Sequence, residues 1–284
     1  MIWQCGGQRV LLGERTLVMG ILNVTPDSFS DGGLYTDPGR AVEHALEMVE
    51  AGADIIDVGG ESTRPGAEPV PAEEERRRVV PVIRALRRQS DVLISVDSYK
   101  AEVARAAVEA GADIVNDISG LGFDEEMPQL LATSGVGLVL MHIKGTPRTM
   151  QRNPVYRDVI GEISGYFAER LAKAEEAGIS REQVVLDPGI GFGKQLVHNL
   201  EILRRLKEFC RLGRPLLVGP SRKSFIGAIL DLPPGQRLEG TAAAVALSIA
   251  GGADVVRVHD VREMVRVARV ADAVVRGLST TAGA

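Results

Sequence analysis

The sequence AGADIIDVGG at residues 51–60 has two close copies, AGADIVNDIS at 110–119 and GGADVVRVHD at 251–260. Each copy closes a segment with helical periodicity and opens a short apolar run rich in β-branched residues. Glycine suits the position just past a helix, because it adopts the left-handed cap conformation without strain. The runs are apolar at successive positions, which is typical of parallel strands buried on both faces. We therefore interpret the repeated phrase as a helix-to-strand junction of an α/β protein.

Eight apolar runs of this kind occur along the chain, with helical segments between them. They occupy residues 17–23, 54–58, 92–97, 114–117, 137–142, 183–187, 215–219 and 254–259. Eight strand–helix units over roughly 250 residues match a closed (β/α)8 TIM barrel better than an open doubly wound sheet, which stays as the alternative. We expect residues 1–284 to form a single barrel domain.

Local signals refine this expectation. The N-terminal stretch IWQCGGQRVLL (2–12) predicts a β-hairpin that turns at Gly6-Gly7 and plugs the bottom of the barrel. Asp37-Pro38 predicts an N-cap followed by proline at the first helical position. Ser98 is expected to cap the helix that runs through Val108.

The composition is that of an ordinary globular protein, with 45% apolar and 25% charged residues. The net charge of −5 provides no global basic field, so we expect no nucleic-acid partner. Cys5 and Cys210 lie far apart in the sequence, and we expect both to be reduced, buried thiols of a cytoplasmic protein. The first residues contain no export signal, and the longest apolar stretch, 242–253, is too short to span a membrane.

Polar residues follow seven of the eight runs at the point where the apolar pattern stops. They are Asn23, Asp97, Asn116-Asp117, His142, Asp187, Ser221-Arg222-Lys223 and Arg257-His259. The remaining run, 54–58, leads into Glu61-Ser62-Thr63-Arg64. In a barrel the carboxyl ends of all strands meet on the face that carries active sites. One such residue would more often be a helix cap, but so many together predict an enzyme or a ligand-binding barrel.

The residue types indicate the kind of ligand. Asp97, Asn116 and Asp187 supply acceptors and an amide, which suit the edge of an amino-heterocycle. Buried carboxylates are costly without partners, so they need donors from a ligand or from basic side chains. Donors suited to a phosphate come from a second set, Thr63, Arg64, Arg257 and His259. The sequence therefore predicts an amino-heterocycle that carries a phosphate, without naming the molecule.

Three other features are interpreted as structural. The glycine-rich stretch GIGFGK (189–194) fails the Walker spacing, because Gln195 follows the lysine in place of Ser or Thr. The charged run EEERRR (73–78) is interpreted as a solvated helix face. His44 lies within one helical segment and His198 opens another, so we expect neither to bind a ligand.

Five blocks of the sequence resemble the signatures of the dihydropteroate synthase family, whose fold is a pterin-binding barrel. NVTPDSFSDGG (23–33) and GGESTRPGA (59–67) are similar to the first two signatures. DPGIGFGK (187–194), SRKSFIG (221–227) and RVHDV (257–261) are similar to the remaining blocks. The resemblance covers residues 15–272, which is nearly the whole chain.

The resemblance implies a reaction of folate synthesis. The amine of p-aminobenzoate attacks the exocyclic methylene of 6-hydroxymethyl-7,8-dihydropterin diphosphate, diphosphate leaves, and 7,8-dihydropteroate forms. Diphosphate leaves readily once its charge is balanced, so no covalent nucleophile is required.

By position, the resemblance also implies roles for individual residues. The pterin would be bound by Asp97, Asn116, Asp187 and Lys223, with Met141 and Phe192 packed around it. The diphosphate would be bound by Thr63, Arg64, Arg257 and His259, with Asn23 in contact with a Mg²⁺ cofactor. The p-aminobenzoate pocket would be shaped by Phe29, Ser62, Pro65 and Ser224. Catalysis is expected to depend on Lys223, Asp97, Asp187 and Arg257.

Two alternatives share parts of this pattern. A pterin-dependent methyltransferase has the Asp and Asn pterin contacts but needs neither Thr63-Arg64 nor the block at 221–225. A pterin-binding paralogue without turnover typically lacks parts of the first two loops, which are intact here. The family is usually dimeric, so we expect a homodimer. Lys144 departs from the family, which usually has a neutral residue in that stretch.

Overall fold

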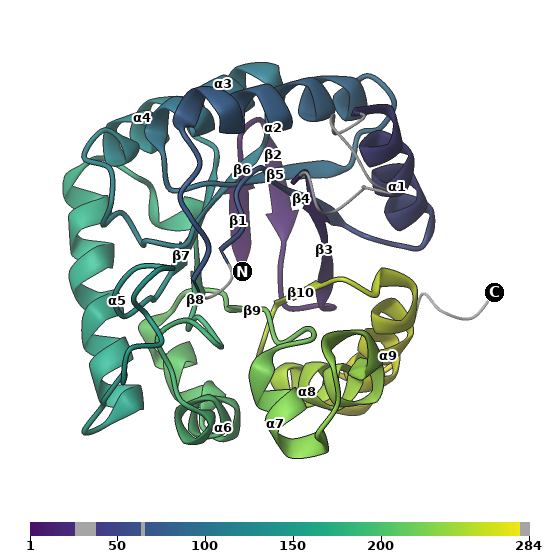
Figure 1. Cartoon of the computed structure of the whole chain (residues 1–284), viewed down its shortest axis with the longest axis vertical. Helices are drawn as coiled ribbons and strands as arrows, with labels where there is room; N and C mark the ends of the chain where they lie inside the picture. The colour runs from purple at the N-terminus through teal and green to yellow at the C-terminus, as the bar shows by residue number, and fades with distance from the viewer. Residues whose placement is uncertain (26–37, 64–65, 279–284) are drawn as a thin grey trace.

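The computed structural model describes residues 1–25, 38–63 and 66–278. Within this part of the chain, eight parallel strands form one sheet in the order β8-β7-β6-β5-β4-β3-β10-β9 (Figure 1). A parallel bridge between Leu186 and Leu216 joins the two ends of this order. The sheet is therefore a closed barrel: the predicted (β/α)8 fold is confirmed, and the open-sheet alternative is wrong.

The barrel strands coincide with the predicted apolar runs. They are β3 (Leu17–Asn23), β4 (Ile55–Gly59), β5 (Leu93–Asp97), β6 (Ile114–Asp117), β7 (Gly137–Met141), β8 (Val184–Asp187), β9 (Leu217–Val218) and β10 (Val255–Val258). Only β9 is much shorter than its predicted run, 215–219. Pro215 opens that run and Pro220 directly follows it, and neither has an N–H for the ladder.

Helices lie outside the barrel wall, between consecutive strands (Figure 1). The α-helices are α1 (Pro38–Glu50), α2 (Ala72–Arg87), α3 (Ala101–Ala110), α4 (Met127–Ser134), α5 (Val159–Glu176), α6 (Leu196–Arg204), α7 (Ser224–Leu230), α8 (Leu238–Ala250) and α9 (Val261–Val275). Short 3-10 helices occupy Arg181–Gln183, Leu206–Leu212 and Pro234–Gln236.

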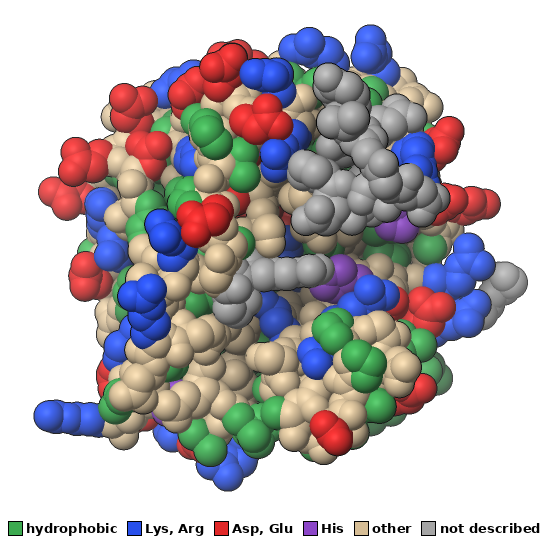
Figure 2. Space-filling view, viewed as in Figure 1, with side chains coloured by type: hydrophobic (Ala, Val, Ile, Leu, Met, Phe, Trp, Pro, Cys, Tyr) green, Lys and Arg blue, Asp and Glu red, His purple; other side chains and the backbone are tan. Residues whose placement is uncertain are grey.

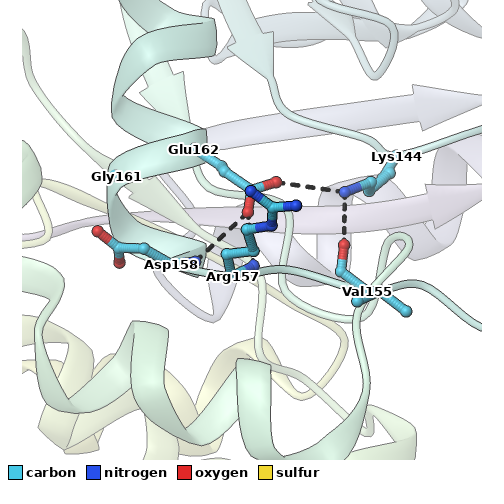
Figure 3. A pocket seen from close by; sticks show the side chains of 6 residues that line it. All are labelled: Lys144, Val155, Arg157, Asp158, Gly161 and Glu162. Atoms are coloured by element: carbon cyan, nitrogen blue, oxygen red, sulfur yellow. Dashed lines mark hydrogen bonds and ion pairs between the residues drawn. The ribbon is translucent and has the colours of Figure 1, made fainter.

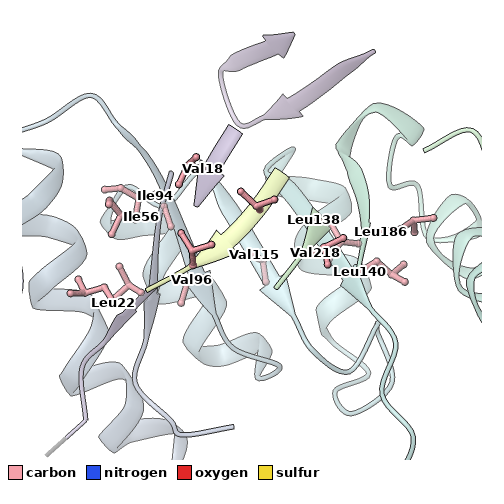
Figure 4. Packing of buried hydrophobic residues seen from close by; sticks show 14 of the residues in the cluster. Val18, Leu22, Ile56, Ile94, Val96, Val115, Leu138, Leu140, Leu186 and Val218 are labelled. Atoms are coloured by element: carbon pink, nitrogen blue, oxygen red, sulfur yellow. The ribbon is translucent and has the colours of Figure 1, made fainter. Parts of the chain in front are cut away.

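Successive residues of each strand point to opposite sides of the barrel wall, and the two sides have different partners. The outward side chains pack under the helices in one large cluster, which includes Val18, Ile56, Ile94, Val115, Leu138, Leu186 and Val218 (Figure 4). The inward side chains form a separate cluster, which includes Met19, Ile55, Leu93, Ile114, Val139, Val185 and Val255. Because both faces of each strand are buried, the strand sequences are apolar at successive positions and do not alternate between apolar and polar residues.

The predicted hairpin is present and closes the amino end of the barrel. β1 (Ile2–Cys5) and β2 (Gln8–Leu11) pair in antiparallel register around Gly6-Gly7. Trp3 is fully buried in the inward cluster, and its Nε1 donates to the carbonyl of Gln183 at 2.8 Å. The hairpin therefore closes this end of the barrel with apolar side chains that pack on the inward cluster.

Both the glycine and the aspartate of the repeated phrase have a structural reason. Gly111 ends α3 with a φ of 113°, and Gly52 and Gly252 also have positive φ values. The aspartate of each copy accepts a hydrogen bond from a backbone N–H of the neighbouring strand region: Asp54 from Val18 at 2.9 Å, Asp113 from Ile94 at 2.9 Å and Asp254 from Leu216 at 3.1 Å. Each junction thus ends a helix and tethers the start of the following strand to its neighbour.

Two local predictions need correction or fall outside the described residues. α3 begins at Ala101, whose N–H donates to Asp124 at 2.8 Å, while Ser98 Oγ accepts only from the N–H of Lys100 at 3.2 Å. The prediction that Ser98 caps this helix is therefore wrong, because the helix starts later and extends to Ala110. Pro38 opens α1 as predicted, whereas Asp37 lies outside the described residues.

The two cysteines differ in their surroundings. Cys5 is buried and Cys210 is exposed, and both are free thiols. The prediction of two buried thiols is thus wrong for Cys210, which lies on the outer 3-10 helix Leu206–Leu212. Among the helices of the described ranges, none is long and apolar enough to cross a membrane.

Candidate active site

The carboxyl ends of the strands carry a polar layer above the apolar interior of the barrel. On β5 the inward positions run from Leu93 through Ser95 to Asp97, and on β6 from Ile114 to Asn116. Asp97 and Asn116 are register partners on neighbouring strands, as are Met141 and Asp187. The pterin-binding residues predicted at the strand ends therefore come together inside the barrel mouth. In the space-filling view, basic and histidine side chains lie beside a hollow near the middle of one face (Figure 2).

Arg257 on β10 links two carboxylates across the barrel. Its Nε donates to Asp57 Oδ2 at 2.6 Å, and its Nη2 donates to Asp97 Oδ2 at 2.7 Å. Asn116 Nδ2 donates to the same oxygen of Asp57 at 3.1 Å. Asp57 is fully buried and was not predicted as a site residue, although it is the single acidic residue inside the apolar run of β4. An acidic residue at an inward position of a buried strand is the signal that could have identified it.

Several acceptors of this layer have no hydrogen-bond partner in the part of the chain that the structure describes. They are Asp57 Oδ1, Asp97 Oδ1, Asn116 Oδ1 and Ser95 Oγ. Buried acceptors without donors cost free energy, and they are rare in folded proteins unless a ligand or water satisfies them. The barrel mouth therefore presents acceptors that are prepared for a ligand with N–H or O–H donors.

Electrostatics bring two groups of this layer close to neutral pH. Burial raises the pKa of Asp97 to about 7, although the guanidinium of Arg257 acts in the opposite direction. Burial lowers the pKa of Lys223 to about 8, and the charge of Arg257 adds to this effect. Burial also lowers the pKa of Arg257, but Asp57 and Asp97 more than reverse the effect, so the net shift is upward. Arg257 is thus permanently charged, while Asp97 and Lys223 can change charge near neutrality.

Lys223 lies beside an apolar wall of the site. Its Nζ is 4.1 Å from the centre of the Phe192 ring. Phe192 and Met141 belong to one buried cluster, together with Ile118, Ile143 and Met150. The two residues predicted to pack around a pterin therefore lie in one wall, and the sequence reasoning missed the other members of the cluster.

Asp187 ends β8 at the foot of the glycine-rich loop 189–194. Its Oδ1 accepts a hydrogen bond from the N–H of Gly189 at 2.7 Å, and Gly189 has a φ of +69°. Burial raises the pKa of Asp187, while the Gly189 N–H and the nearby Lys223 lower it. The loop thus positions the carboxylate.

His259 follows β10 at the rim of the site. Its Nδ1 lies 2.9 Å from Ser221 Oγ, and its backbone N–H donates to the same hydroxyl at 3.2 Å. Burial lowers the pKa of His259 to about 3, and Arg257 and Arg222 add to the effect. The imidazole is therefore neutral at pH 7 and offers a single N–H to an anion, and its role in binding diphosphate stays a prediction.

The remaining predicted residues are placed as follows. Asn23 ends β3 as the register partner of Gly59, and Thr63 and Ser62 follow β4. Ser224 is the exposed first residue of α7. Phe29, Arg64 and Pro65 lie outside the described residues.

Two polar strand-end residues predicted for this face point outward instead. Asp117 accepts from the N–H groups of Ser119 and Leu121, both at 2.8 Å, and so shapes the turn after β6. His142 is buried against Lys194, whose Nζ lies 3.0 Å from His142 Nδ1. Both residues directly follow an inward position, so the two-residue period of the strand places them on the other side of the wall.

Lys194 is a buried lysine that the sequence reasoning did not single out. Its Nζ donates to the carbonyl oxygen of Phe192 at 2.9 Å and to that of His142 at 3.3 Å. Burial lowers the pKa of Lys194, and it lowers the pKa of His142 to about 2. Lys194 therefore holds the loop that carries Phe192 against the end of β7.

His198 has a structural role, as predicted, because its Nδ1 accepts a hydrogen bond from the N–H of Gln195 at 3.1 Å at the start of α6.

The charged run 73–78 is only partly a solvated face. Glu75 is 1% exposed, and with Glu61 it binds the ammonium group of Lys100. Tyr99 Oη donates to Glu61 Oε1 at 2.7 Å, and the N–H of Val70 donates to Glu61 Oε2 at 2.8 Å. The prediction of a solvated face is thus wrong for Glu75. Through Lys100, which also donates to the carbonyl of Val70, Glu75 helps to fix the chain segment that leads into α2.

Lys144, the residue that departs from the family, is held by the start of α5 (Figure 3). Its Nζ donates to the carbonyl of Val155 at 2.6 Å and lies 3.3 Å from Glu162 Oε2. It also lies 4.1 Å from the centre of the Tyr156 ring. Lys144, Val155 and Glu162 line a surface pocket of about 580 Å³, and the carboxylate of Glu162 balances the charge of Lys144.

Comparisons with known proteins agree with this geometry. The family described as pterin binding enzyme matches residues 19–259. The dihydropteroate synthase of Synechocystis sp. is 54% identical over 265 residues, which cover 93% of this chain and 92% of that protein.

Solved structures give the same result. The Xanthomonas albilineans dihydropteroate synthase with 4-aminobenzoic acid is 45% identical, with a TM-score of 0.91 and coverage of 98% of this chain and 99% of that one. A structure of the enzyme from the same organism in complex with 7,8-dihydropteroate has a TM-score of 0.88 at 42% identity, covering 98% of this chain and 100% of that one. The chain therefore belongs to the pterin-binding enzymes and, within them, to the dihydropteroate synthases, which are transferases of folate biosynthesis.

Proposed function

We propose that the polar layer at the barrel mouth binds 6-hydroxymethyl-7,8-dihydropterin diphosphate and that p-aminobenzoate lies beside it. The observation that carries this proposal is the pair of buried acceptors, Asp97 Oδ1 and Asn116 Oδ1, that lack a partner in the described residues. A pterin has N–H and NH₂ donors along one edge of its ring, so it can satisfy both acceptors at once. The energetic cost of leaving these oxygens empty becomes a gain on binding.

Other residues of the site suit the remainder of the pterin. Asp187 offers a further buried carboxylate. Burial raises its pKa while the nearby Lys223 acts to lower it, so the two can share the polar edge of the ring. Met141 and Phe192 offer an apolar wall for the ring faces. Lys223, next to Phe192, would reach the heteroatoms nearest to the reacting methylene.

The diphosphate would lie toward Arg257, His259 and Thr63, with Arg64 from the same motif as a further donor. Arg257 keeps its charge, and neutral His259 supplies one N–H. These donors would balance the negative charge of the departing diphosphate, so the reaction needs no covalent nucleophile.

A Mg²⁺ ion fits this arrangement at Asn23. A Cβ on Gly59 would stand 3.9 Å from Asn23 Oδ1 and 3.7 Å from Asp97 Oδ2, so the glycine leaves the space between the two oxygens open. The described residues contain no group of three His, Cys, Asp or Glu side chains that could hold a metal by themselves. This suits Mg²⁺, which commonly binds one or two protein oxygens together with substrate phosphates. When bound, the ion would neutralise charge on the diphosphate.

The reaction then needs positioning and charge stabilisation. The amine nitrogen of p-aminobenzoate forms a bond to the methylene carbon while the C–O bond to diphosphate breaks, and the nitrogen loses a proton. Asp97 and Asp187 would stabilise positive charge that spreads into the pterin ring as this bond breaks. Ser62 and Ser224, with Phe29 and Pro65, would surround the p-aminobenzoate.

The test is release of diphosphate from the pterin substrate by the purified protein with p-aminobenzoate and Mg²⁺. We expect Asn116→Ala to lower kcat/KM for the pterin by about 10–100-fold, because it removes a buried acceptor for a ligand donor. His44→Ala, on the surface of α1, is the matched control and should not change it. Binding of the pterin without release of diphosphate would favour the non-catalytic alternative, and methyl transfer would favour the methyltransferase.

We also propose that two copies associate through α6, α7 and α8, as a homodimer. These helices surround an apolar groove of about 720 Å³. Leu247 on α8 and Ile229 on α7 line it and are 60% and 56% exposed, which is costly for large apolar side chains in water. Sedimentation should show a dimer, and Leu247→Arg should convert it to a monomer, whereas Val274→Arg on α9 should not. A monomeric wild-type protein would contradict the proposal of a dimer.

We also propose a cytoplasmic location for the protein, which is compatible with its two free thiols.

A further inference from the structure

Asp57 is a fully buried carboxylate of β4 to which the proposed reaction assigns no role. We propose that Asp57 is a positioning residue that fixes the side-chain amide of Asn116 with its oxygen toward the pterin. The site would thereby accept a hydrogen-bond donor at this position and reject an acceptor. The inference rests on the proposed binding of the pterin at Asn116.

Asp57 accepts hydrogen bonds from two side chains. Its Oδ2 receives Arg257 Nε at 2.6 Å and Asn116 Nδ2 at 3.1 Å. An oxygen that receives two N–H donors uses its lone pairs for both and carries no hydrogen of its own. An amide has a donor end and an acceptor end, and only the donor end can face this oxygen. If the amide of Asn116 turned over, two acceptors would meet inside the barrel.

The consequence lies at the other end of the amide. Asn116 Oδ1 is buried and has no partner within the described ranges of the chain. With its NH₂ group held by Asp57, the amide cannot rotate to offer that group to a ligand in place of the oxygen. Buried amides that lack such an anchor can present either end, so they discriminate poorly between donors and acceptors.

Arg257 extends the same control to the neighbouring strand. Its Nη2 binds Asp97 Oδ2 at 2.7 Å and leaves Asp97 Oδ1 without a partner in the described structure. Asp97 and Asn116 are register partners, so their open oxygens lie on adjacent strands. Asp57 orients the amide directly and supports the carboxylate through Arg257. Together they prepare two adjacent acceptors for two donors on one ligand edge.

A different role for Asp57 would be to balance the charge of Arg257, and substitutions separate the two. Asp57→Asn removes the charge but keeps an oxygen that accepts from Asn116 and Arg257. Asp57→Ala removes both the charge and the acceptor. Positioning predicts that Asn is tolerated and Ala is not, whereas charge balance predicts that both variants lose the same function.

The experiment is calorimetric titration of two pteridines into the purified protein. One is 6-hydroxymethylpterin, and the other has a carbonyl in place of the 2-amino group and so presents an acceptor where the pterin presents a donor. We expect wild type and Asp57→Asn to prefer the pterin by similar factors, within about fivefold, and Asp57→Ala to lose about tenfold or more of this preference. His44→Ala is the control, because His44 lies on the exposed surface of α1, outside the barrel mouth. It should match wild type.

A second pair of variants covers the case in which Asp57→Ala does not fold. Asn116→Asp sets two carboxylates against each other and should weaken pterin binding by about tenfold or more. Adding Asp57→Asn restores a donor between the two positions and should recover most of that loss. Equal loss of preference in Asp57→Asn and Asp57→Ala, an unchanged preference in Asp57→Ala, or no recovery in the double variant would overturn the inference. A wild-type protein that binds neither pteridine would instead overturn the proposed function, and this inference with it.

Discussion

Lys100 holds two buried glutamates at the root of the loop after β4, and its replacement by methionine tests how much this contact stabilises the fold. The ammonium group lies 2.6 Å from Glu61 Oε2, contacts Glu75 Oε2, and donates to the carbonyl of Val70 at 2.7 Å. The Glu61 and Glu75 side chains are 5% and 1% exposed. Methionine keeps most of the side-chain volume, so the substitution removes the charge and the donors with little loss of packing.

The expected cost follows from the burial of the two carboxylates. Removing one partner of a buried ion pair typically costs about 3–5 kcal/mol, because a charge is left uncompensated. Glu61 keeps the donors of Tyr99 and Val70, so Glu75 carries most of the penalty. We therefore expect Lys100→Met to lower the free energy of unfolding by about 3–5 kcal/mol at pH 7.5.

The loss of stability in Lys100→Met is expected to depend on pH. Burial raises the pKa of Glu75 even with Lys100 in place, and Lys100 acts to lower it. Without Lys100 the folded-state pKa rises further above the unfolded value, so the penalty is complete above the folded-state pKa and shrinks as the pH falls through it. The difference between wild type and variant should therefore fall to about half or less at pH 5.

Urea unfolding of both proteins at pH 7.5 and pH 5 measures these values. The double variant Lys100→Met/Glu75→Gln should recover about 2 kcal/mol, because it removes the unpaired charge. Arg76→Met is the matched control, since Arg76 of α2 pairs with Glu102 of α3 on the exposed surface and its loss should cost no more than about 1 kcal/mol. A loss in Lys100→Met no larger than that of Arg76→Met, or one that does not shrink at pH 5, would refute the reasoning.

Three further predictions concern the site and the plug of the barrel. Lys223→Ala should lower kcat/KM for both substrates by about 10–100-fold, or roughly 1.5–3 kcal/mol, and kinetics near those of wild type would remove Lys223 from the site. Affinity for the pterin, followed by calorimetry from pH 6 to 9, should rise through about pH 7 as Asp97 becomes charged and fall above about pH 8 as Lys223 loses its proton, whereas a flat profile would contradict these roles. Trp3→Ala should lower the free energy of unfolding by about 3–5 kcal/mol in urea, because it empties a fully buried space and frees the Gln183 carbonyl; a change below about 1 kcal/mol would show that the hairpin is not a plug.

Much of the fold could be predicted from local patterns. The repeated phrase marks three helix-to-strand junctions, because a glycine with positive φ and a tethering aspartate are needed at each, as at Gly111 and Asp113. The starts of some helices depend on contacts that a local pattern does not contain. The start of α3, for example, is set by Asp124, which lies 23 residues further along the chain from Ala101.

The site was predictable to the extent that strand order places strand ends on one face. Asp97, Asn116 and Asp187 come together as expected, because each occupies an inward position. Asp117 and His142 were misplaced, since a terminal polar residue points inward or outward according to its position in the two-residue period. That period is visible only when the inward and outward apolar clusters are known.

The sequence alone establishes the strand–helix repeat, the face on which polar residues gather and the family signatures, because each depends on residues close together in the chain. The tertiary structure alone reveals which polar atoms are satisfied and which stay open to a ligand. Asp57 binds Arg257 across 200 residues and Asn116 across 59, and this pairing leaves the Asn116 oxygen without a partner in the described residues. The pKa of Asp97 is likewise set by its burial and by Arg257, 160 residues away. Hydrogen bonding and desolvation act over a few ångströms in space, so the chemistry of the site appears only once the barrel has brought distant strands together.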